Sequence, residues 1–510
     1  MPTDAPLSLD RLPQGGLTAR PSTAQAGKIS IMVWLYLLTI VLPIQINAGG
    51  IVLMPTRVIL MILLVPMMIN LVTGKFGRIL AVDVFFVLHM AWVLVAIAAN
   101  NPNRVVENVG STVVEFLGGY MLGRAYIRTP EQFQKLAIGL LVMNALLLPL
   151  SFPETLNGTA IIPKLIASIP GVSTVKQVTY ERRMGLERVQ NAFAHPIHYG
   201  LFCSVCLSLV FMGLKDRLTP FMRVAGSAIV FCGVFLSLSS GALLSAILQI
   251  GLFTWAYIFR NFARKWLMLL GLFAAMYVAI DLLSNRTPSK VLMSYATFSA
   301  QTAYYRSIIN DWGMRNVWAN PIFGLGLRDW VKPSFMTTTS VDDFWLVVAM
   351  RYGIPGFLFL AIGYGLGLIK IGRRDFGDNE RMNRLRLVWM ITFAGLSFTL
   401  VTVHVWTAIY TFVFFLFGAG IWMADYQPPP TATAQGEPDD NGGRRLNYSR
   451  QRVSAGRGGP QATPTDAASE ASAPAGNPYS RFAPRTPAAG PSTDPPARPP
   501  SRPTSRGGSR

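Results

Sequence analysis

Two adjacent carboxylates, Asp342 and Asp343, stand where a long polar segment meets an apolar run of the sequence. Two arginines on polar segments, Arg188 and Arg306, offer a fixed positive charge and a planar fork of donors that suits phosphate oxygens. A carboxylate can accept a proton from a hydroxyl group, and a nearby cation stabilises negative charge developing on a departing phosphate. These residue types suit the attack of a sugar hydroxyl on a carbon atom whose leaving group is a phosphate ester.

Each of these residues also has a structural interpretation. A lone arginine such as Arg188 or Arg306 at a lipid–water boundary commonly extends to headgroups. An aspartate pair ahead of a helix can serve as its N-cap and complement the helix dipole. The carboxylates could also hold a divalent ion, and His195 with His198 could be ligands or bases, but two residues make an incomplete ligand set. We expect no metal and no cofactor, and because no Walker or G-x-G-x-x-G motif appears on the cytoplasmic side, a nucleotide donor is not indicated.

The composition is that of an integral membrane protein. Of the 510 residues, 51% are hydrophobic and 14% are charged, whereas a soluble domain carries about 25% charged residues. Continuous apolar runs, each long enough to cross a bilayer core, predict an all-α polytopic membrane protein with about 12 transmembrane helices. The predicted spans are residues 29–47, 51–73, 79–99, 111–127, 134–153, 192–213, 221–238, 241–259, 265–284, 343–371, 385–402 and 404–424.

The basic residues predict the orientation of these spans. The formal net charge is +20, and in a twelve-span alternation the connections rich in Lys and Arg all fall on one side, which the positive-inside rule makes cytoplasmic. Both termini are then cytoplasmic, and membrane lipids, not nucleic acid, are the expected neighbours of the basic residues. Residues 1–28 and 425–510 are predicted to be cytoplasmic tails, the second of them disordered because it lacks large apolar residues.

Two long connections, residues 154–191 and 285–342, lie on the opposite face in this alternation. Long loops on a helical scaffold are a common place for function. Within the second loop, the apolar residues of 301–318 follow helical spacing and predict a helix along the membrane surface. This helix carries Arg306 and, one face away, Arg315.

The tenth predicted span contains a break. Gly353 and Gly356 flank Pro355, and a break inside a membrane is tolerated where the freed backbone groups face protein or water. We interpret the break as a substrate cavity just below the carboxylates, to which His195 would also contribute.

Four stretches resemble motifs of the O-antigen ligase and polysaccharide polymerase family of bacterial membrane glycosyltransferases. Residues 188–196 resemble an Arg…Gly-Thr-Phe-x-His/Asn-Pro-Asn segment, and residues 238–242 resemble a Thr/Ser-x-Ser-Arg-Gly-Ala helix start. Residues 306–326 are similar to an Arg…Trp…Pro-x-x-Gly-x-Gly pattern, and residues 342–356 have the spacing of a His-Asn/Ser/Gln-x9-Gly-x-x-Gly box.

The resemblance implies a C-type glycosyltransferase-like architecture with two long periplasmic loops. It further implies metal-independent transfer of glycan from an undecaprenyl-diphosphate-linked oligosaccharide at the periplasmic face of the bacterial inner membrane. Arg188 and Arg306, with Arg315 in reserve, match arginines expected to bind the donor diphosphate. Asp342, or alternatively Asp343, would act as the general base.

The sequence departs from the family pattern at two positions. Asp342 stands where the ligases have the histidine assigned as base, and Ser240 stands where the family usually has an arginine. A carboxylate can still serve as base if desolvation or a second carboxylate raises its pKa. The missing histidine favours polymerisation of lipid-linked repeats over ligation to another acceptor. A lipid-linked oligosaccharide transporter or flippase, and a non-catalytic partner of polysaccharide assembly and export proteins, are the alternatives.

Overall fold

The computed structural model describes residues 27–48, 51–285, 287, 288, 291, 300–336 and 339–427. The predicted tails therefore lie almost wholly outside the described residues, and so does part of the predicted loop 285–342. Among the described residues, nine helices are long and apolar enough to cross a membrane. This confirms the prediction of an all-α polytopic membrane protein.

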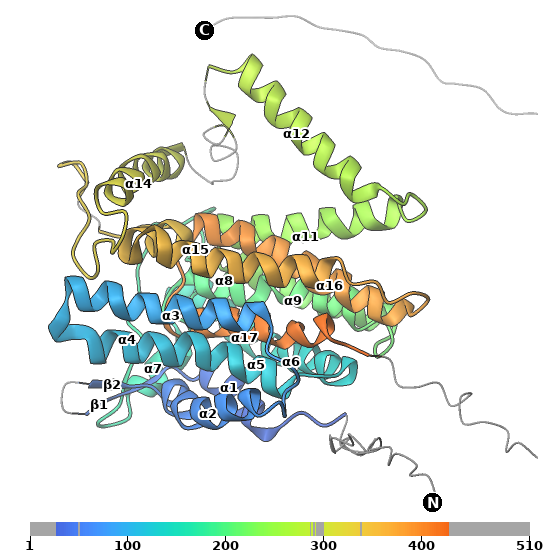
Figure 1. The fold of residues 1–510 in the computed structure, drawn as a ribbon, viewed down its shortest axis with the longest axis horizontal. Coiled ribbons are helices and arrows are strands. Elements are labelled where there is room, and N and C mark those ends of the chain that lie inside the picture. The colour runs from blue at the N-terminus through green and yellow to red at the C-terminus, as the bar shows by residue number, and fades with distance from the viewer. Residues whose placement is uncertain are drawn as a thin grey trace, which may run out of the picture. The chain divides into compact units, whose positions relative to one another are not determined.

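The nine helices coincide with nine of the predicted spans (Figure 1). They are α2 (Pro55–Val72), α3 (Ala81–Asn100), α6 (Pro130–Asn157), α8 (Pro196–Ser204) with α9 (Cys206–Ser208) and the π-turn η3 (Leu209–Gly213), α11 (Ser240–Ile258), α12 (Lys265–Leu283), α15 (Phe344–Gly372), α16 (Glu380–Thr402), and α17 (Thr407–Ile421) with η4 (Trp422–Ala424).

Helical segments also occupy the other three predicted spans. Two of them are shorter apolar helices, and the third changes its winding at a central π-turn. These segments are α1 (Ile31–Val41), α10 (Pro220–Leu236), and the succession α4 (Val105–Val113), η2 (Val114–Gly118) and α5 (Gly119–Tyr126). The connections contain η1 (Pro102–Arg104), α7 (Ile161–Ala167) and the helix α14 (Ala300–Ala319).

A small antiparallel sheet corrects the first predicted span. The helix expected over 29–47 ends at Val41, and the chain continues as β1 (Ile44–Ala48), which pairs with β2 (Ile51–Leu53) and β3 (Ser173–Thr174) in the order β2-β1-β3. Pro43 has no backbone N–H to continue the helix, and isoleucine at 44 and 46 favours a strand. The sheet joins the start of the chain to the first long loop.

Close backbone contact between α5 and α17 forms the centre of the bundle. A β-carbon added at Gly119 or Gly123 of α5 would collide with backbone atoms of α17, and one added at Gly418 of α17 would collide with the Tyr120 carbonyl. Glycines four residues apart allow this approach between membrane helices. Because α17 is largely buried, the residues at its start are held firmly against the neighbouring helices.

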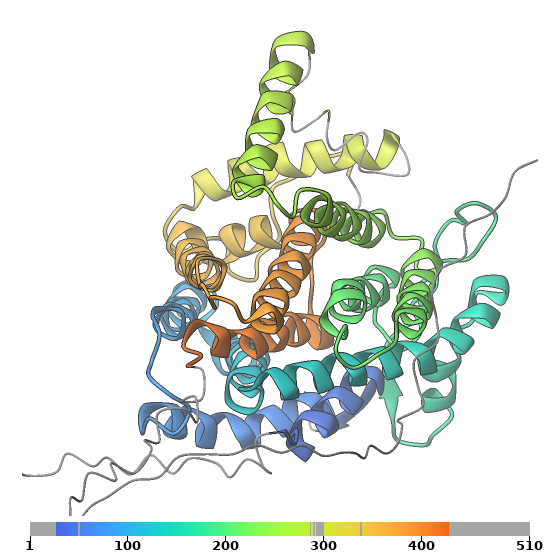
Figure 2. The same ribbon diagram turned by 90° about the vertical axis from the view of Figure 1, so that its right-hand side faces the viewer.

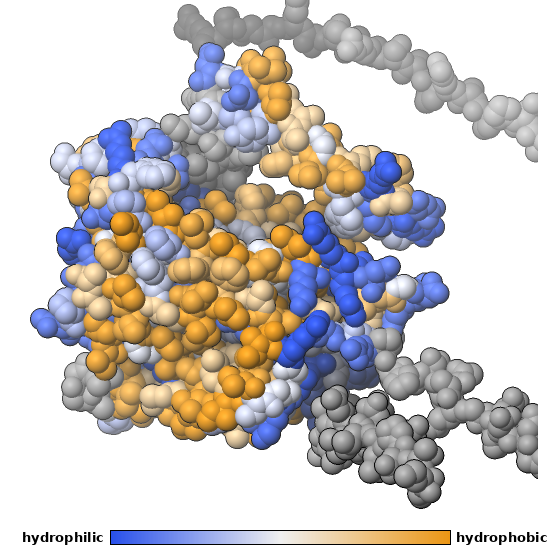
Figure 3. Space-filling model, in the orientation of Figure 1, coloured by the Kyte–Doolittle hydropathy of each residue, from blue (hydrophilic) through white to orange (hydrophobic). Residues whose placement is uncertain are grey.

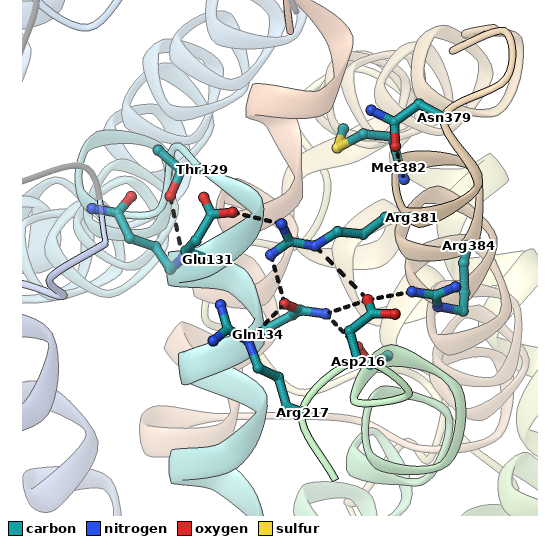
Figure 4. Close-up of polar contacts among 11 residues, drawn as sticks. Thr129, Glu131, Gln134, Asp216, Arg217, Asn379, Arg381, Met382 and Arg384 are labelled. Carbon is teal, nitrogen blue, oxygen red and sulfur yellow. Dashed lines mark hydrogen bonds and ion pairs between the residues drawn. The ribbon is translucent and has the colours of Figure 1, made fainter. Parts of the chain in front are cut away.

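The connections 73–80, 127–129, 214–219 and 373–379 lie at one end of the bundle together with residues 425–427, and each of the four carries one or two arginines. We call this the basic end. Figure 4 shows one network there: Arg381 donates to Glu131 at 2.6 Å and to Gln134 at 2.7 Å, while Arg384 contacts Asp216. The network links α6, the 214–219 connection and α16. Five connections carry the basic residues of the predicted alternation, and four of them, near residues 75–78, 124–135, 215–223 and 370–381, meet at this end. Figure 3 shows this hydrophilic area beside the hydrophobic middle of the visible face.

Helix α12 differs from the other spans because none of its residues is buried. Figures 1 and 2 both show it standing away from the neighbouring helices. A helix that is apolar on every side matches a lipid environment, so α12 fits a span surrounded by lipid.

Candidate functional site

The two aspartates have different surroundings at the start of α15. Asp343 is the N-cap of the helix, and its carboxylate accepts a hydrogen bond from the backbone N–H of Leu346 at 3.0 Å. Burial raises the pKa of Asp343 to about 6, although the N–H groups and the Arg306 charge oppose this rise. Asp342 is half-buried and accepts a hydrogen bond from the Ser340 hydroxyl at 3.2 Å. Asp343 thus caps the helix and Asp342 does not, while both carboxylates lie within range of charges from outside α15.

Those charges come from Arg188 and Arg306. Burial lowers the pKa of both guanidinium groups, that of Arg188 to about 10, and the negative charge of Asp342 opposes the shift in both. Arg188 lies 4.8 Å from the centre of the Tyr180 ring. Its Nε, and the Nε and Nη1 of Arg306, are buried without a hydrogen-bond partner among the described residues. Buried donors left open in this way suit an anionic ligand.

A third arginine, Arg183, joins this cluster, although no motif or spacing in the sequence singles it out. Its positive charge contributes to lowering the pKa of Arg188 and Arg306. Its Nη1 donates to the Leu238 carbonyl at 2.6 Å, two residues before Ser240. The first long loop therefore brings a guanidinium close to the helix start where the family pattern expects an arginine.

Arg315 does not join the cluster. It is nine residues beyond Arg306 on α14, which places it on the opposite side of the helix and about 13.5 Å further along the axis. Its exposed guanidinium lies 4.9 Å from the centre of the Trp312 ring. Helix α14 packs through Ile309 and Val317 into a cluster with residues of α15, so the predicted helix is present and rests on α15. Its apolar residues are not confined to that side, since Met314 and Trp318 are exposed.

His195 lies next to the arginines but serves as a helix cap. Its Nδ1 accepts a hydrogen bond from the backbone N–H of Ile197 at 3.0 Å, at the start of α8. Burial, followed by the charges of Arg188 and Arg183, lowers the pKa of His195 to about 3. The imidazole is therefore neutral at neutral pH and offers only its other nitrogen as a donor.

Aromatic rings connect His195 to the start of α15. The Trp406 ring lies 5.9 Å from His195, 4.0 Å from His198 and 5.9 Å from His404, and His404 stacks on Phe344 at 6.3 Å. Three of the four histidines of the chain thus meet around one tryptophan. Sequence reasoning missed His404 and Trp406 because it placed both inside the span predicted over 404–424, whereas they lie in the connection between α16 and α17. In the described part of the chain no group of three or more His, Cys, Asp or Glu could hold a metal ion.

The predicted break in α15 is present, but protein atoms fill it. Gly353 has a φ of 73° and a ψ of 178° inside the helix. Backbone groups of the 320–326 segment satisfy the break: the N–H of Leu325 donates to the Met350 carbonyl at 2.7 Å, and the Pro321 carbonyl accepts from Ile354 at 2.7 Å. The Arg…Trp…Pro-x-x-Gly-x-Gly stretch therefore attaches the second long loop to α15.

The same contacts contradict the prediction of a substrate cavity at these glycines. A β-carbon on Gly353 would collide with the Ile322 carbonyl, and one on Gly356 would meet Tyr352 and Trp92. The Gly356 carbonyl lies 2.8 Å from Nδ1 of His89 on α3. Both glycines serve close packing, and the charged groups of this region lie in the arginine and aspartate cluster instead.

The sequence profile of the protein family described as O-Antigen ligase matches residues 225–361. This match confirms, over that segment, the family resemblance drawn from the motifs. The segment includes Arg306, both aspartates and the break in α15, but not the loop that carries Arg188. No curated protein sequence matches this chain.

Proposed function

Because the chain is a multi-pass helical membrane protein that carries an O-antigen ligase domain, we propose that it polymerises lipid-linked oligosaccharide repeats by glycosyl transfer. The observation that carries the proposal is that the Asp342 charge acts on both Arg188 and Arg306, each of which has buried donors unpaired within the described residues. Fixed cations beside one proton acceptor are what a diphosphate leaving group and a hydroxyl nucleophile require.

In the proposed reaction, a hydroxyl of one lipid-linked repeat attacks the anomeric carbon of the chain on a second carrier. The new C–O bond forms as the bond to the carrier diphosphate breaks, and the diphosphate leaves with the electron pair. Asp342 accepts the hydroxyl proton. Arg188 and Arg306, aided by Arg183, bind the diphosphate and stabilise its increased charge. This mechanism uses no metal ion.

The carrier is proposed to be undecaprenyl diphosphate, and the site is proposed to face the periplasm from the bacterial inner membrane. The arginine-rich basic end supports this orientation, because the positive-inside rule puts such connections, and with them both termini, in the cytoplasm. Asp342 in place of the ligase histidine favours polymerisation. The alternative within the family is transfer of the glycan to another acceptor.

A defined assay tests the proposal. Proteoliposomes receive lipid-linked repeats, and the length of the products is compared between the intact protein and Asp342→Asn at equal protein abundance. Long chains from the intact protein and single repeats from the variant support a polymerase. Transfer of one glycan to a different acceptor, without extension, would indicate a ligase. Movement of repeats across the bilayer without any extension would contradict glycosyl transfer and favour a transporter.

A further inference from the structure

A polar cavity of about 640 Å³ lies at the basic end of the bundle. This cavity is separate from the proposed glycosyl-transfer site. Asp343 of that site and Arg374 of the cavity flank the opposite ends of the 29-residue helix α15. The cavity is lined by the connection between α2 and α3, the end of α5, the residues before α6, and the residues that follow α15 and α17. Nothing in the proposed glycosyl transfer uses it.

The cavity has an excess of positive charge. Arg78, Arg124, Arg128 and Arg374 line it, and among the lining residues that the structure describes Asp425 is the one carboxylate. Asp425 is already engaged, because Arg78 donates to it at 2.6 and 3.0 Å and Lys370 lies 3.8 Å away.

The other arginines that line the cavity have less negative charge close to them. Arg124 is almost fully buried, with Nε 3.5 Å from the carboxylate of Asp83. Arg128 and Arg374 have no carboxylate partner within the described ranges. In the part of the chain that the structure describes, two guanidinium groups beside the cavity are therefore left without a counter-charge.

Neutral acceptors hold these two guanidinium groups in place. Arg128 donates to the Lys75 carbonyl at 2.9 Å, and Arg374 donates to the Tyr426 carbonyl at 2.8 Å. Other donors remain open: Nε of Arg374 and the indole N–H of Trp422, which is 5% exposed, are buried without a hydrogen-bond partner in the described residues. The residues that line the cavity thus offer donors and positive charge in excess of acceptors, which favours an anion as the ligand.

We propose that this cavity binds a phosphoryl group, held by Arg128 and Arg374 with Trp422 beside it. A planar guanidinium suits phosphate oxygens in charge and shape. Trp422 and Tyr426, whose rings lie 5.7 Å apart, are residue types enriched at the level of lipid headgroups. The phosphate of an acidic phospholipid and free inorganic phosphate share this chemistry, and the experiment separates them.

The test uses full-length protein purified in detergent. Mixed micelles supply equal amounts of phosphatidylglycerol and phosphatidylcholine, and native mass spectrometry counts the lipids retained. Arg374→Gln should reduce retained phosphatidylglycerol about tenfold, the effect of losing one charge-assisted contact. The control is Arg373→Gln, because it removes the same charge from an exposed neighbour outside the cavity lining and should change retention no more than about twofold.

A second arm replaces lipid with inorganic phosphate and measures the thermal midpoint against chloride at equal ionic strength. One supporting result is that phosphate raises the thermal midpoint of the intact protein but not of Arg374→Gln, while lipid retention is the same in both proteins. This result would support the phosphoryl site and would identify its ligand as soluble phosphate. Equal lipid loss in Arg373→Gln, or no effect of Arg374→Gln in either arm, overturns the proposal. If Arg374→Gln aggregates on size exclusion, Arg128→Gln takes its place, because that side chain is exposed and is less needed for folding.

Discussion

Asp343 accepts a hydrogen bond from the backbone N–H of Leu346 at 3.0 Å and thereby caps α15, while Asp342 is free of that task. The same substitution should therefore act differently at the two positions. Asp342→Asn removes the proposed proton acceptor, and we expect chain extension to fall about 10²–10⁴-fold. Asp343→Asn keeps a side chain that caps helices equally well and should preserve most of the activity. Equal losses of extension, measured at equal membrane abundance, would contradict this division of roles.

The pH dependence of stability gives a separate test of Asp343. Its pKa is raised from 3.8 to about 6, chiefly by burial. A raised pKa in the folded state means that the carboxyl group stabilises the fold while protonated: the contribution is fully present below about pH 4 and is lost as the pH rises through about 6. Asp343→Asn should therefore increase the free energy of unfolding by as much as about 3 kcal/mol at about pH 8, and by little at about pH 4.

Thermal midpoints of the purified protein and of Asp343→Asn, measured across this pH range, check the prediction. A variant that is less stable than the intact protein at the alkaline end would mean that the ionised carboxylate itself stabilises the fold.

Arg188 and Arg306 lie in the proposed site, whereas Arg315 lies on the opposite side of α14 from Arg306. Arg306→Ala and Arg188→Ala each remove donors that have no protein partner among the described residues, and we expect each to lower extension about 10²-fold, the loss seen when one charge-stabilising donor is removed. Arg315→Ala is the matched control, since it deletes the same side chain from the opposite side of α14. Initial rates with lipid-linked repeats measure the three variants. A loss for Arg315→Ala as large as that for Arg306→Ala would return Arg315 to the site.

His404 tests whether a histidine replaces the one missing from the ligase pattern. Burial, followed by the charge of Arg351, lowers its pKa to about 4, so it is neutral at neutral pH and could accept a proton. If Asp342 is the base, His404→Gln should reduce extension no more than about tenfold, and the remaining loss would reflect its packing between Phe344 and Trp406. Initial rates of extension, set beside those of Asp342→Asn, measure this. A loss equal to that of Asp342→Asn would transfer the role of base to His404.

The spans could be predicted from the sequence because each one is a local property of the chain. About 20 apolar residues can cross a bilayer only as a helix or within a barrel, and α3, α12 and α15 lie close to their predicted positions. The strands at 44–53 were missed, because a short apolar run beside Pro43 has no helical or strand period long enough to separate the two. The π-turn at 114–118 has no compositional signal either.

The site was less predictable because it depends on contacts between distant segments. The chemistry of the side chains was enough to select Asp342, Arg188 and Arg306, and in the structure the charge of Asp342 acts on both arginines. Hydropathy cannot show that Arg183 approaches the start of α11, or that Trp406 lies between histidines from two connections, since these pairs are joined only in the folded chain. The break at Gly353 was predicted correctly, but not that the 320–326 segment fills it.

The filled break in α15 makes Gly353 sensitive to substitution. Gly353 has a backbone conformation that is almost confined to glycine, and a β-carbon there would collide with the Ile322 carbonyl. Gly353→Ala should therefore destabilise the protein by at least about 1–3 kcal/mol and separate the 320–326 segment from α15. Gly365→Ala is the control on the same helix: a β-carbon there meets nothing within 4 Å, and alanine should be neutral or stabilise by about 0.5–1 kcal/mol. Thermal midpoints and membrane abundance of the two variants measure this. Equal stability of both would mean that the segment does not depend on the break, and the attachment of the second long loop to α15 would then need another cause.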